Sequence, residues 1–173
     1  MPLVIRPARL TDIPAITDIY NHAGVASTAS WHLKPVSVAT QEAIYRHRRQ
    51  HDQPTFVAEL DDDLLGYSTY GSFRDMDGYA RTAEHSIYVL AGHRGEGIGH
   101  KLMAPIIDHA LDAGLHALVG ALDGSNQTSI DFHRSVGFTE VGRLPQVGFK
   151  FGRWLDLVFV ELILTPDLRS ADD

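Results

Sequence analysis

The sequence of 173 residues contains no cysteine. Disulfide bonds, thiolate nucleophiles and cysteine-ligated metal sites are therefore excluded. The chain also lacks any run of about 18 consecutive apolar residues, which is the length that a membrane-spanning helix needs. Its first ten residues, MPLVIRPARL, have no long apolar core of the kind found in secretory signal peptides. These absences predict a cytoplasmic protein with no membrane partner.

Positive charge is scarce as well. Lys and Arg number 15 against 22 Asp and Glu, which gives a formal charge of −7 at pH 7. Because nucleic acid binding depends on basic surfaces, we predict no nucleic acid partner. The ten histidines form no HExxH pattern, so we predict no metal. No repeat or linker divides the chain, and we predict a single domain over residues 1–166 with a charged tail over residues 167–173.

What the chain does have is a cluster of glycines between a predicted strand and a predicted helix. Residues 85–90 mix β-branched and aromatic side chains, as strands do. Residues 94–99 read RGEGIG, and apolar residues then recur every four positions from Ile98 to Ala110. A glycine-rich loop that opens a helix is typical of phosphate binding, because its N–H groups approach an anion closely and the helix dipole attracts it. A connector without a ligand is the alternative.

Two familiar phosphate-binding motifs do not fit this loop. Residues 97–101, GIGHK, lack the Gly-Lys-Ser/Thr ending of a Walker loop. His100 stands where the dinucleotide fingerprint requires its third glycine. The pattern that does fit is Arg/Gln-x-x-Gly-x-Gly/Ala after a strand.

The order of predicted elements indicates an α/β (α+β) protein with a mixed central sheet and helices on both faces. Strands are predicted over 3–6, 55–60, 64–72, 85–90, 116–122, 138–141 and 154–164, with a polar link between the last two. Helices are predicted over 12–23, 37–50, 98–113 and 127–136, with a kink at Pro105. The loop over residues 25–34, which carries Trp31, is either a lid over a site or a plug against the core.

Four stretches resemble the GNAT superfamily of N-acetyltransferases. Residues 94–99 resemble its acetyl-CoA pyrophosphate loop, and residues 126–138, NQTSIDFHRSVGF, resemble its second conserved block. Residues 81–89, RTAEHSIYV, resemble the Thr-x-Glu-x-Ser-x-Tyr-Val block of the phosphinothricin and methionine sulfoximine acetyltransferases. Residues 147–156, VGFKFGRWLD, resemble the C-terminal signature of that group. The resemblance extends from Ile5 to Leu164 and implies the GNAT fold.

The resemblance implies transfer of acetyl from acetyl-CoA to the α-amino group of methionine sulfoximine, methionine sulfone or phosphinothricin. The amine attacks directly, and Glu84 is its expected base; a surface carboxylate paired with Arg81 is the alternative. Backbone N–H groups at Tyr88 and Val89 are expected to stabilise the oxyanion. His133 is either a general acid or a packed helix histidine. The expected cofactor-binding residues are Ile87, Tyr88, Val89, Arg94, Gly95, Glu96, Gly97, Ile98, Gly99, Asn126 and Ser135.

The acceptor is expected to bind in the loop between residues 73 and 82. Guanidinium groups pair bidentately with carboxylate and phosphinate-like oxygens. The expected substrate-binding residues are Phe73, Arg74, Met76, Tyr79 and Arg81. The resemblance also implies a homodimer in which Lys150 and Trp154 complete the neighbour's site. Two alternatives remain: a GNAT enzyme acting on a polyamine or a peptide N-terminus, and a non-catalytic acyl-CoA-binding sensor.

Overall fold

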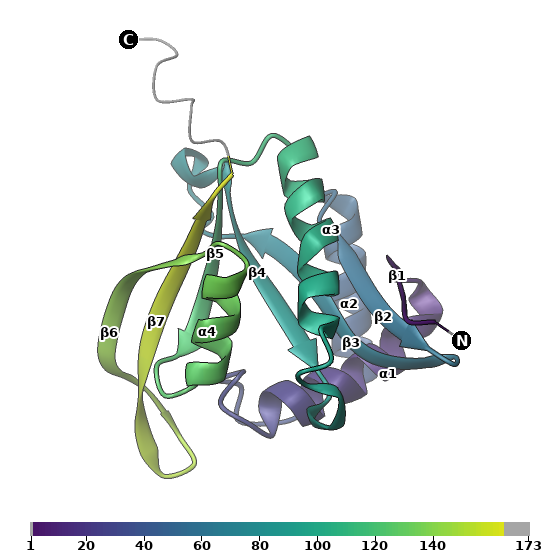
Figure 1. Ribbon diagram of the computed structural model, residues 1–173, viewed down its shortest axis with the longest axis horizontal. Coiled ribbons are helices and arrows are strands. Elements are labelled where there is room, and N and C mark those ends of the chain that lie inside the picture. Colours follow the sequence, from purple (N-terminus) through teal and green to yellow (C-terminus); the bar gives the residue numbers. More distant parts are fainter. Residues whose placement is uncertain (1, 165–173) are drawn as a thin grey trace.

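The computed structural model describes residues 2–164, which form one mixed sheet of seven strands (Figure 1). The spatial order of the strands is β1-β2-β3-β4-β5-β7-β6. All neighbours are antiparallel except β4 and β5, which run parallel. The strands are β1 (Val4–Pro7), β2 (Thr55–Leu60), β3 (Asp63–Ser72), β4 (Thr82–Val89), β5 (Ala117–Asp123), β6 (Thr139–Lys150) and β7 (Arg153–Ile163).

Helices cover both faces of the sheet, as the sequence predicted. Figure 1 shows α3 (Ile98–Asp112) and α4 (Gln127–Ser135) on the near face, with α1 (Ile13–Ile19) and α2 (Val38–Gln50) behind it. The side chains of β2 alternate between these layers. Val57 packs in the cluster of α1 and α2, whereas Ala58 packs in the cluster that contains Leu102 of α3. The π-helical turn Tyr20–Val25 continues α1, and short 3-10 turns lie at Leu10–Asp12, Asp77–Tyr79 and Ala91–His93.

The feature that creates a site is the divergence of β4 and β5 in the middle of the sheet. Their parallel pairing covers only Thr82–Glu84 against Ala117–Val119. Beyond it, β4 stays paired with β3 as far as Val89, and β5 stays paired with β7 as far as Asp123. The second half of β4 therefore has one edge without a strand partner.

Hydrogen bonds at both ends of β4 determine which backbone groups face this open edge. Phe73 N–H donates to the Thr82 carbonyl, and Leu90 N–H donates to the Leu65 carbonyl. Since backbone groups alternate along a strand, the even-numbered residues of β4 direct their N–H and C=O groups towards β3. The odd-numbered ones, including Ile87 and Val89, direct theirs towards the opening.

One strand differs clearly from the sequence-based expectation. Strand β6 runs from Thr139 to Lys150, although the polar link was expected to begin after residue 141. Pro145 is tolerated because β6 is an edge strand and its register shifts between Leu144 and Gly148. Helix α3 spans Pro105 without interruption, and the kink expected there stays a prediction. The predicted tail over residues 167–173 lies outside the described residues.

Candidate active site

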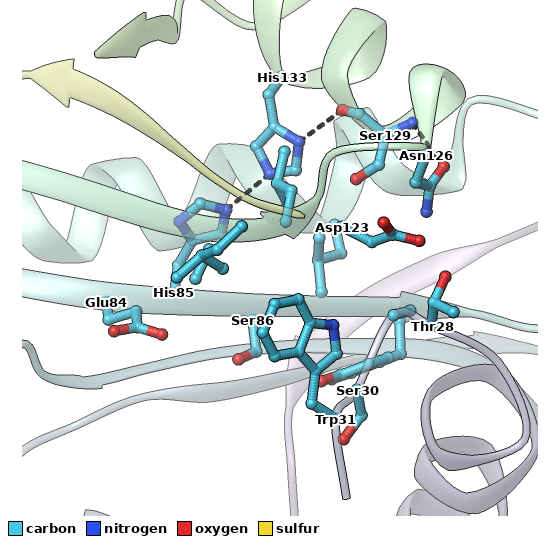
Figure 2. A pocket seen from close by; sticks show the side chains of 16 residues that line it. Thr28, Ser30, Trp31, Glu84, His85, Ser86, Asp123, Asn126, Ser129 and His133 are labelled. Carbon is cyan, nitrogen blue, oxygen red and sulfur yellow. Dashed lines mark hydrogen bonds between the residues drawn. The ribbon is translucent and has the colours of Figure 1, made fainter. Parts of the chain in front are cut away.

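A cavity of about 310 Å³ occupies the opening between β4 and β5 (Figure 2). We call it the first cavity. Its lining comes from the loop that follows the π-helical turn, from both diverging strands, from α4 and from β7. The lining residues are Thr28, Ala29, Ser30, Trp31, Glu84, His85, Ser86, Ile87, Tyr88, Ala121, Leu122, Asp123, Asn126, Ser129, His133 and Leu157.

Glu84 lies on the α1/α2 side of this cavity. Strand alternation places Glu84 and Ser86 on the same side of β4 as Trp31 and opposite His85, as Figure 2 shows. Burial raises the pKa of the Glu84 carboxyl, and the positive charge of Arg74 partly opposes that rise. The alternative pairing of Glu84 with Arg81 is not observed: Arg81 is exposed, and Arg74 is the basic residue that affects the Glu84 carboxylate.

On the opposite side of β4, His85 and His133 form a buried pair. Their Nε2 atoms are 2.9 Å apart, His85 Nδ1 lies 2.9 Å from the Val119 carbonyl oxygen, and His133 Nδ1 lies 2.6 Å from the Ser129 carbonyl oxygen. Burial lowers the pKa of both, that of His85 to about 3 with a further contribution from His133. Both nitrogens of His133 are thus engaged with protein atoms. This geometry matches the packed-histidine alternative, and the general-acid role stays a prediction.

A second cavity of about 340 Å³ lies next to the first on the α1/α2 side of the sheet. The register places Val119 beside Glu84 and Glu161 beside Val119, so Glu84, which lines the first cavity, neighbours residues that line the second. The lining residues are Phe73, Arg74, Tyr79, Thr82, Val119, Val141, Gly142, Phe159 and Glu161. Three of the five expected substrate-binding residues therefore meet here.

The other two expected substrate-binding residues line neither cavity. Met76 is 65% exposed, and Arg81 is exposed at the beginning of β4. Arg81 instead places its backbone carbonyl in the sheet, where it accepts the N–H groups of His116 and Ala117. A role for these two side chains in holding the acceptor stays a prediction. The pattern FRDMDGYART did not reveal which of its side chains turn towards the sheet.

The glycine loop leaves open space next to its backbone at the N-terminus of α3. Gly95 and Gly97 have φ angles of +85° and +79°, and a Cβ at either would meet nothing within 4 Å. These left-handed conformations favour glycine. Arg94 is held across the loop, because its Nε donates to the Val89 carbonyl at 3.3 Å. The open backbone at the helix N-terminus fits an anionic group such as a diphosphate.

The remaining expected cofactor residues lie on α4. Asn126 lines the first cavity and caps α4, since its side-chain oxygen accepts Ser129 N–H at 3.1 Å. Ser135 lies at the other end of α4, outside both cavities, where its hydroxyl contacts His100 of α3 at 2.9 Å. Asn126 therefore lies beside the opening between β4 and β5, whereas Ser135 lies beside α3, the helix that follows the glycine loop.

The loop over residues 25–31 lines this site, which was one of the two interpretations of the sequence. Trp31 lines the first cavity, so the loop forms a wall of the site and is not a plug in the core. The Lys150 side chain is only 4% exposed, and its ammonium donates to backbone carbonyls of this loop within the same chain. The expectation that Lys150 completes a neighbour's site is wrong for this reason. Trp154, in contrast, is 61% exposed.

Among residues 2–164 no group of three or more His, Cys, Asp or Glu side chains is arranged to hold a metal ion. Within the same range no helix is both long and apolar enough to cross a membrane.

The diverging strands, the glycine loop and the cavity between them define an acetyltransferase of the GNAT family. The model of the acetyltransferase (GNAT) family matches residues 16–138, and the chain belongs to that family. An L-methionine sulfoximine/L-methionine sulfone acetyltransferase from Salmonella typhimurium is 42% identical, over 99% of each chain. A phosphinothricin N-acetyltransferase from Alcaligenes faecalis is 34% identical, over 91% of this chain and 80% of the relative.

Solved structures agree on the fold. An acetyltransferase structure from Salmonella typhimurium with its cofactor acetyl-CoA superposes with a TM-score of 0.94 at 41% identity, covering 100% of this chain and 99% of the other. A GNAT phosphinothricin acetyltransferase from Sinorhizobium meliloti in complex with acetyl-CoA gives a TM-score of 0.93 at 28% identity, covering 100% and 94%. The GNAT fold predicted from the sequence is confirmed.

Proposed function

We propose that the protein transfers acetyl from acetyl-CoA to the α-amino group of a small amino acid or analogue, such as methionine sulfoximine, methionine sulfone or phosphinothricin. The observation that carries the proposal is the position of Glu84. A half-buried carboxylate stands between the opened β4 edge and a second cavity that contains Arg74. The names of the relatives at 42% and 34% identity support the substrate class.

Acetyl-CoA supplies the activated thioester, and the chain's own residues would hold it at three places. The open backbone of Gly95 and Gly97 at the start of α3 would receive the diphosphate. The free edge of β4 would pair with the amide-bearing arm, and Asn126 lies beside that edge. These placements extend the superfamily resemblance to residues of this chain.

Glu84 would remove a proton from the acceptor amine, directly or through one water molecule. An α-amino group is mostly an unreactive ammonium at pH 7, so a base is needed before its nitrogen attacks the thioester carbon. The C–N bond forms, the C–S bond breaks and the thiolate leaves. A carboxylate whose pKa is raised by burial is a stronger base than an exposed one.

Backbone N–H groups of the open edge would stabilise the negative charge that develops on the acetyl oxygen. The alternation of β4 directs the N–H of Val89 and Ile87 to that edge, and that of Tyr88 towards β3. We therefore assign this role to Ile87 and Val89 and no longer to Tyr88. The Tyr88 side chain packs edge-on against Tyr20, with ring centroids 5.3 Å apart.

Arg74 would bind the acceptor's carboxylate or side-chain oxygens in the second cavity. Its guanidinium lies 4.6 Å from the centre of the Phe73 ring, and its positive charge lowers the pKa of the Glu84 carboxyl. An acceptor with its carboxylate at Arg74 would place its amino group near Glu84, because Glu84 is paired with Val119 of the second cavity and feels the charge of Arg74. This arrangement favours an anionic amino acid over a polyamine.

Two further expectations belong to this proposal. A homodimer is expected because β6, β7 and their connection expose a group of apolar side chains, and sedimentation at several concentrations would detect or exclude it. The exposed residues are Val141, Leu144, Val147, Phe149, Phe151 and Trp154. A cytoplasmic location stays a prediction.

Release of free thiol from acetyl-CoA tests the function. The acceptor panel contains methionine sulfoximine, methionine sulfone, phosphinothricin, free methionine and spermidine. We expect turnover with at least one of the first three and little with spermidine. Turnover with none of the first three would overturn the substrate class. Acetyl-CoA binding without turnover on any acceptor would support the acyl-CoA sensor.

The glycine loop gives a separate prediction about the cofactor. In Gly97→Val a β-branched residue meets φ = +79°, which costs about 1–2 kcal/mol and forces the loop out of its conformation. We expect the KM for acetyl-CoA to rise about tenfold while the acceptor KM stays unchanged. Gly92→Val is the matched control, because Gly92 has no positive φ and open space around its Cβ position. Equal KM values for the two variants would contradict a diphosphate site at Gly97.

A further inference from the structure

One buried cation is not used by the proposed chemistry. The ammonium of Lys150, at the end of β6, donates to three backbone carbonyl oxygens: Val25 at 2.7 Å, Ser27 at 2.6 Å and Ser30 at 2.6 Å. An ammonium has three N–H bonds, so these contacts use all of them. The contacts are charge-assisted and join segments that are 120 or more residues apart in the chain.

Val25 ends the π-helical turn, and Ser27 and Ser30 belong to the loop after it, which forms one side of the first cavity. Thr28, Ala29, Ser30 and Trp31 all line that cavity. Carbonyl dipoles that converge on one point repel one another unless a cation lies between them. Without the Lys150 ammonium, this turn of the loop would therefore lose the interaction that draws its carbonyls together.

Strand β6 also sets the position of the Trp31 ring. A Cβ added at Gly148 would lie 2.4 Å from Trp31 Cζ3, so the indole packs directly on the backbone of β6. The same pleat places Gly148 and Lys150 on one side of β6, two residues apart. The loop is held at one other point as well, since the Tyr20 and Ser30 hydroxyls lie 2.8 Å apart.

We propose that Lys150 is a positioning residue for the acceptor: its ammonium holds the loop over residues 25–30 against β6, so that Trp31 forms a fixed wall of the first cavity. Lys150 touches neither acceptor nor cofactor and acts through the loop. The catalytic consequence rests on the proposed function, whereas the contact between Lys150 and the loop does not. The width of the first cavity on the side of Glu84 is thereby set from β6.

Kinetics of Lys150→Met test the consequence. We expect kcat/KM for the acceptor to fall by about 10²-fold, because a wall displaced by about 1 Å misplaces the amine. The dissociation constant for acetyl-CoA, measured calorimetrically, should change far less, because the diphosphate is assigned to the glycine loop, which does not line the first cavity. Lys34→Met is the matched control, since Lys34 is an exposed lysine in the connection between the π-helical turn and α2. Parallel losses in acetyl-CoA affinity and acceptor kcat/KM would indicate general damage and overturn the positioning role.

The absence of cysteine allows a chemical rescue. Lys150→Cys, alkylated with 2-bromoethylamine while unfolded and then refolded, regains an ammonium at the same chain length. Alkylation with iodoacetamide gives a neutral side chain, and wild type taken through the same steps controls for refolding. We expect activity with the ammonium only. Lys150→Arg should not substitute, because a planar guanidinium does not match three acceptors that converge on one point. Equal activity of the charged and neutral products would overturn the proposal.

Quenching of Trp31 fluorescence tests the contact between Lys150 and the loop without requiring catalytic turnover. The chain has two tryptophans, so in a Trp154→Phe background Trp31 is the sole reporter. Lys150→Met and Gly148→Ala should each increase quenching of Trp31 by acrylamide, and Gly78→Ala, with open space at its Cβ, should not. Unchanged quenching in Lys150→Met would overturn the proposal. A wild type that is inactive on all acceptors would remove the proposed function and leave this readout intact.

Discussion

Replacing Glu84 with glutamine is expected to lower kcat by about 10²- to 10⁴-fold, the range typical of a lost general base. Glutamine keeps the size of the side chain but has no basic oxygen. It is neutral, so it also removes the burial penalty of a charge and should leave the fold intact. Stopped-flow or thiol-release assays with saturating acetyl-CoA and methionine sulfone measure the change.

The control for Glu84→Gln is Glu42→Gln. Glu42 lies on α2, where its 39% exposed side chain pairs with Arg46 within one helical turn. Loss of such a pair changes stability little and should leave kcat unchanged. Acetyl-CoA affinity is expected to be the same in both variants and in the wild type. A Glu84→Gln enzyme with wild-type kcat would remove Glu84 from the mechanism and leave direct deprotonation by solvent.

The pH dependence of the wild type follows from the same residue. The base works as a carboxylate, so kcat/KM falls as pH decreases through the pKa of Glu84. Burial raises that pKa above its ordinary value, and Arg74 opposes the rise. The acidic limb of the kcat/KM profile should therefore lie at a higher pH than one set by an exposed glutamate. In Arg74→Met the limb should move to higher pH, because the opposing positive charge is gone. A shift to lower pH would contradict this assignment.

Sequence reasoning located the elements whose signals are local. Strand β2 was predicted with its observed bounds, because the mostly apolar run from Thr55 to Leu60 is followed at once by three turn-forming aspartates, residues 61–63. Asn126 was predicted to open α4, and its side chain does accept the Ser129 N–H. The glycine loop was predicted before α3, which begins at Ile98. In each case neighbours in the sequence are also the interacting partners.

Features that depend on distant contacts were missed. Strand β6 contains Gly142, Pro145 and Gly148, which indicate a break when they are considered alone. They are tolerated because β6 is an edge strand, and Gly148 is required by the Trp31 ring. The pairing of His85 with His133 joins residues 48 apart. The sequence contains no periodicity that would link such positions.

Truncation of Leu102 to alanine is expected to destabilise the fold by about 2–5 kcal/mol, the range for buried leucines. Leu102 is fully buried in the cluster that contains Ala58, Leu65 and Ile98. A Cβ at Gly66 would lie 3.2 Å from its Cδ1, so α3 packs tightly on β3 and a cavity would remain. Urea unfolding followed by circular dichroism gives the free energy of unfolding.

Leu111→Ala provides the control on the same helix. Its side chain is 41% exposed, so the substitution should cost no more than about 0.5 kcal/mol. Equal destabilisation by the two substitutions would contradict the burial of the Leu102 side chain between α3 and the sheet.

Acetyl-CoA separates the role of α3 in stability from its role in binding. A ligand that binds only the folded protein stabilises it by about 2.7 kcal/mol at 100 times its dissociation constant. If the first turn of α3 keeps its conformation in Leu102→Ala, this increment should equal that of the wild type. Gly97→Val should behave in the opposite way, with a smaller increment at the same acetyl-CoA concentration, because the loop itself is altered. The helix would then be supported by its buried face, while the ligand is bound by the backbone at its N-terminal end.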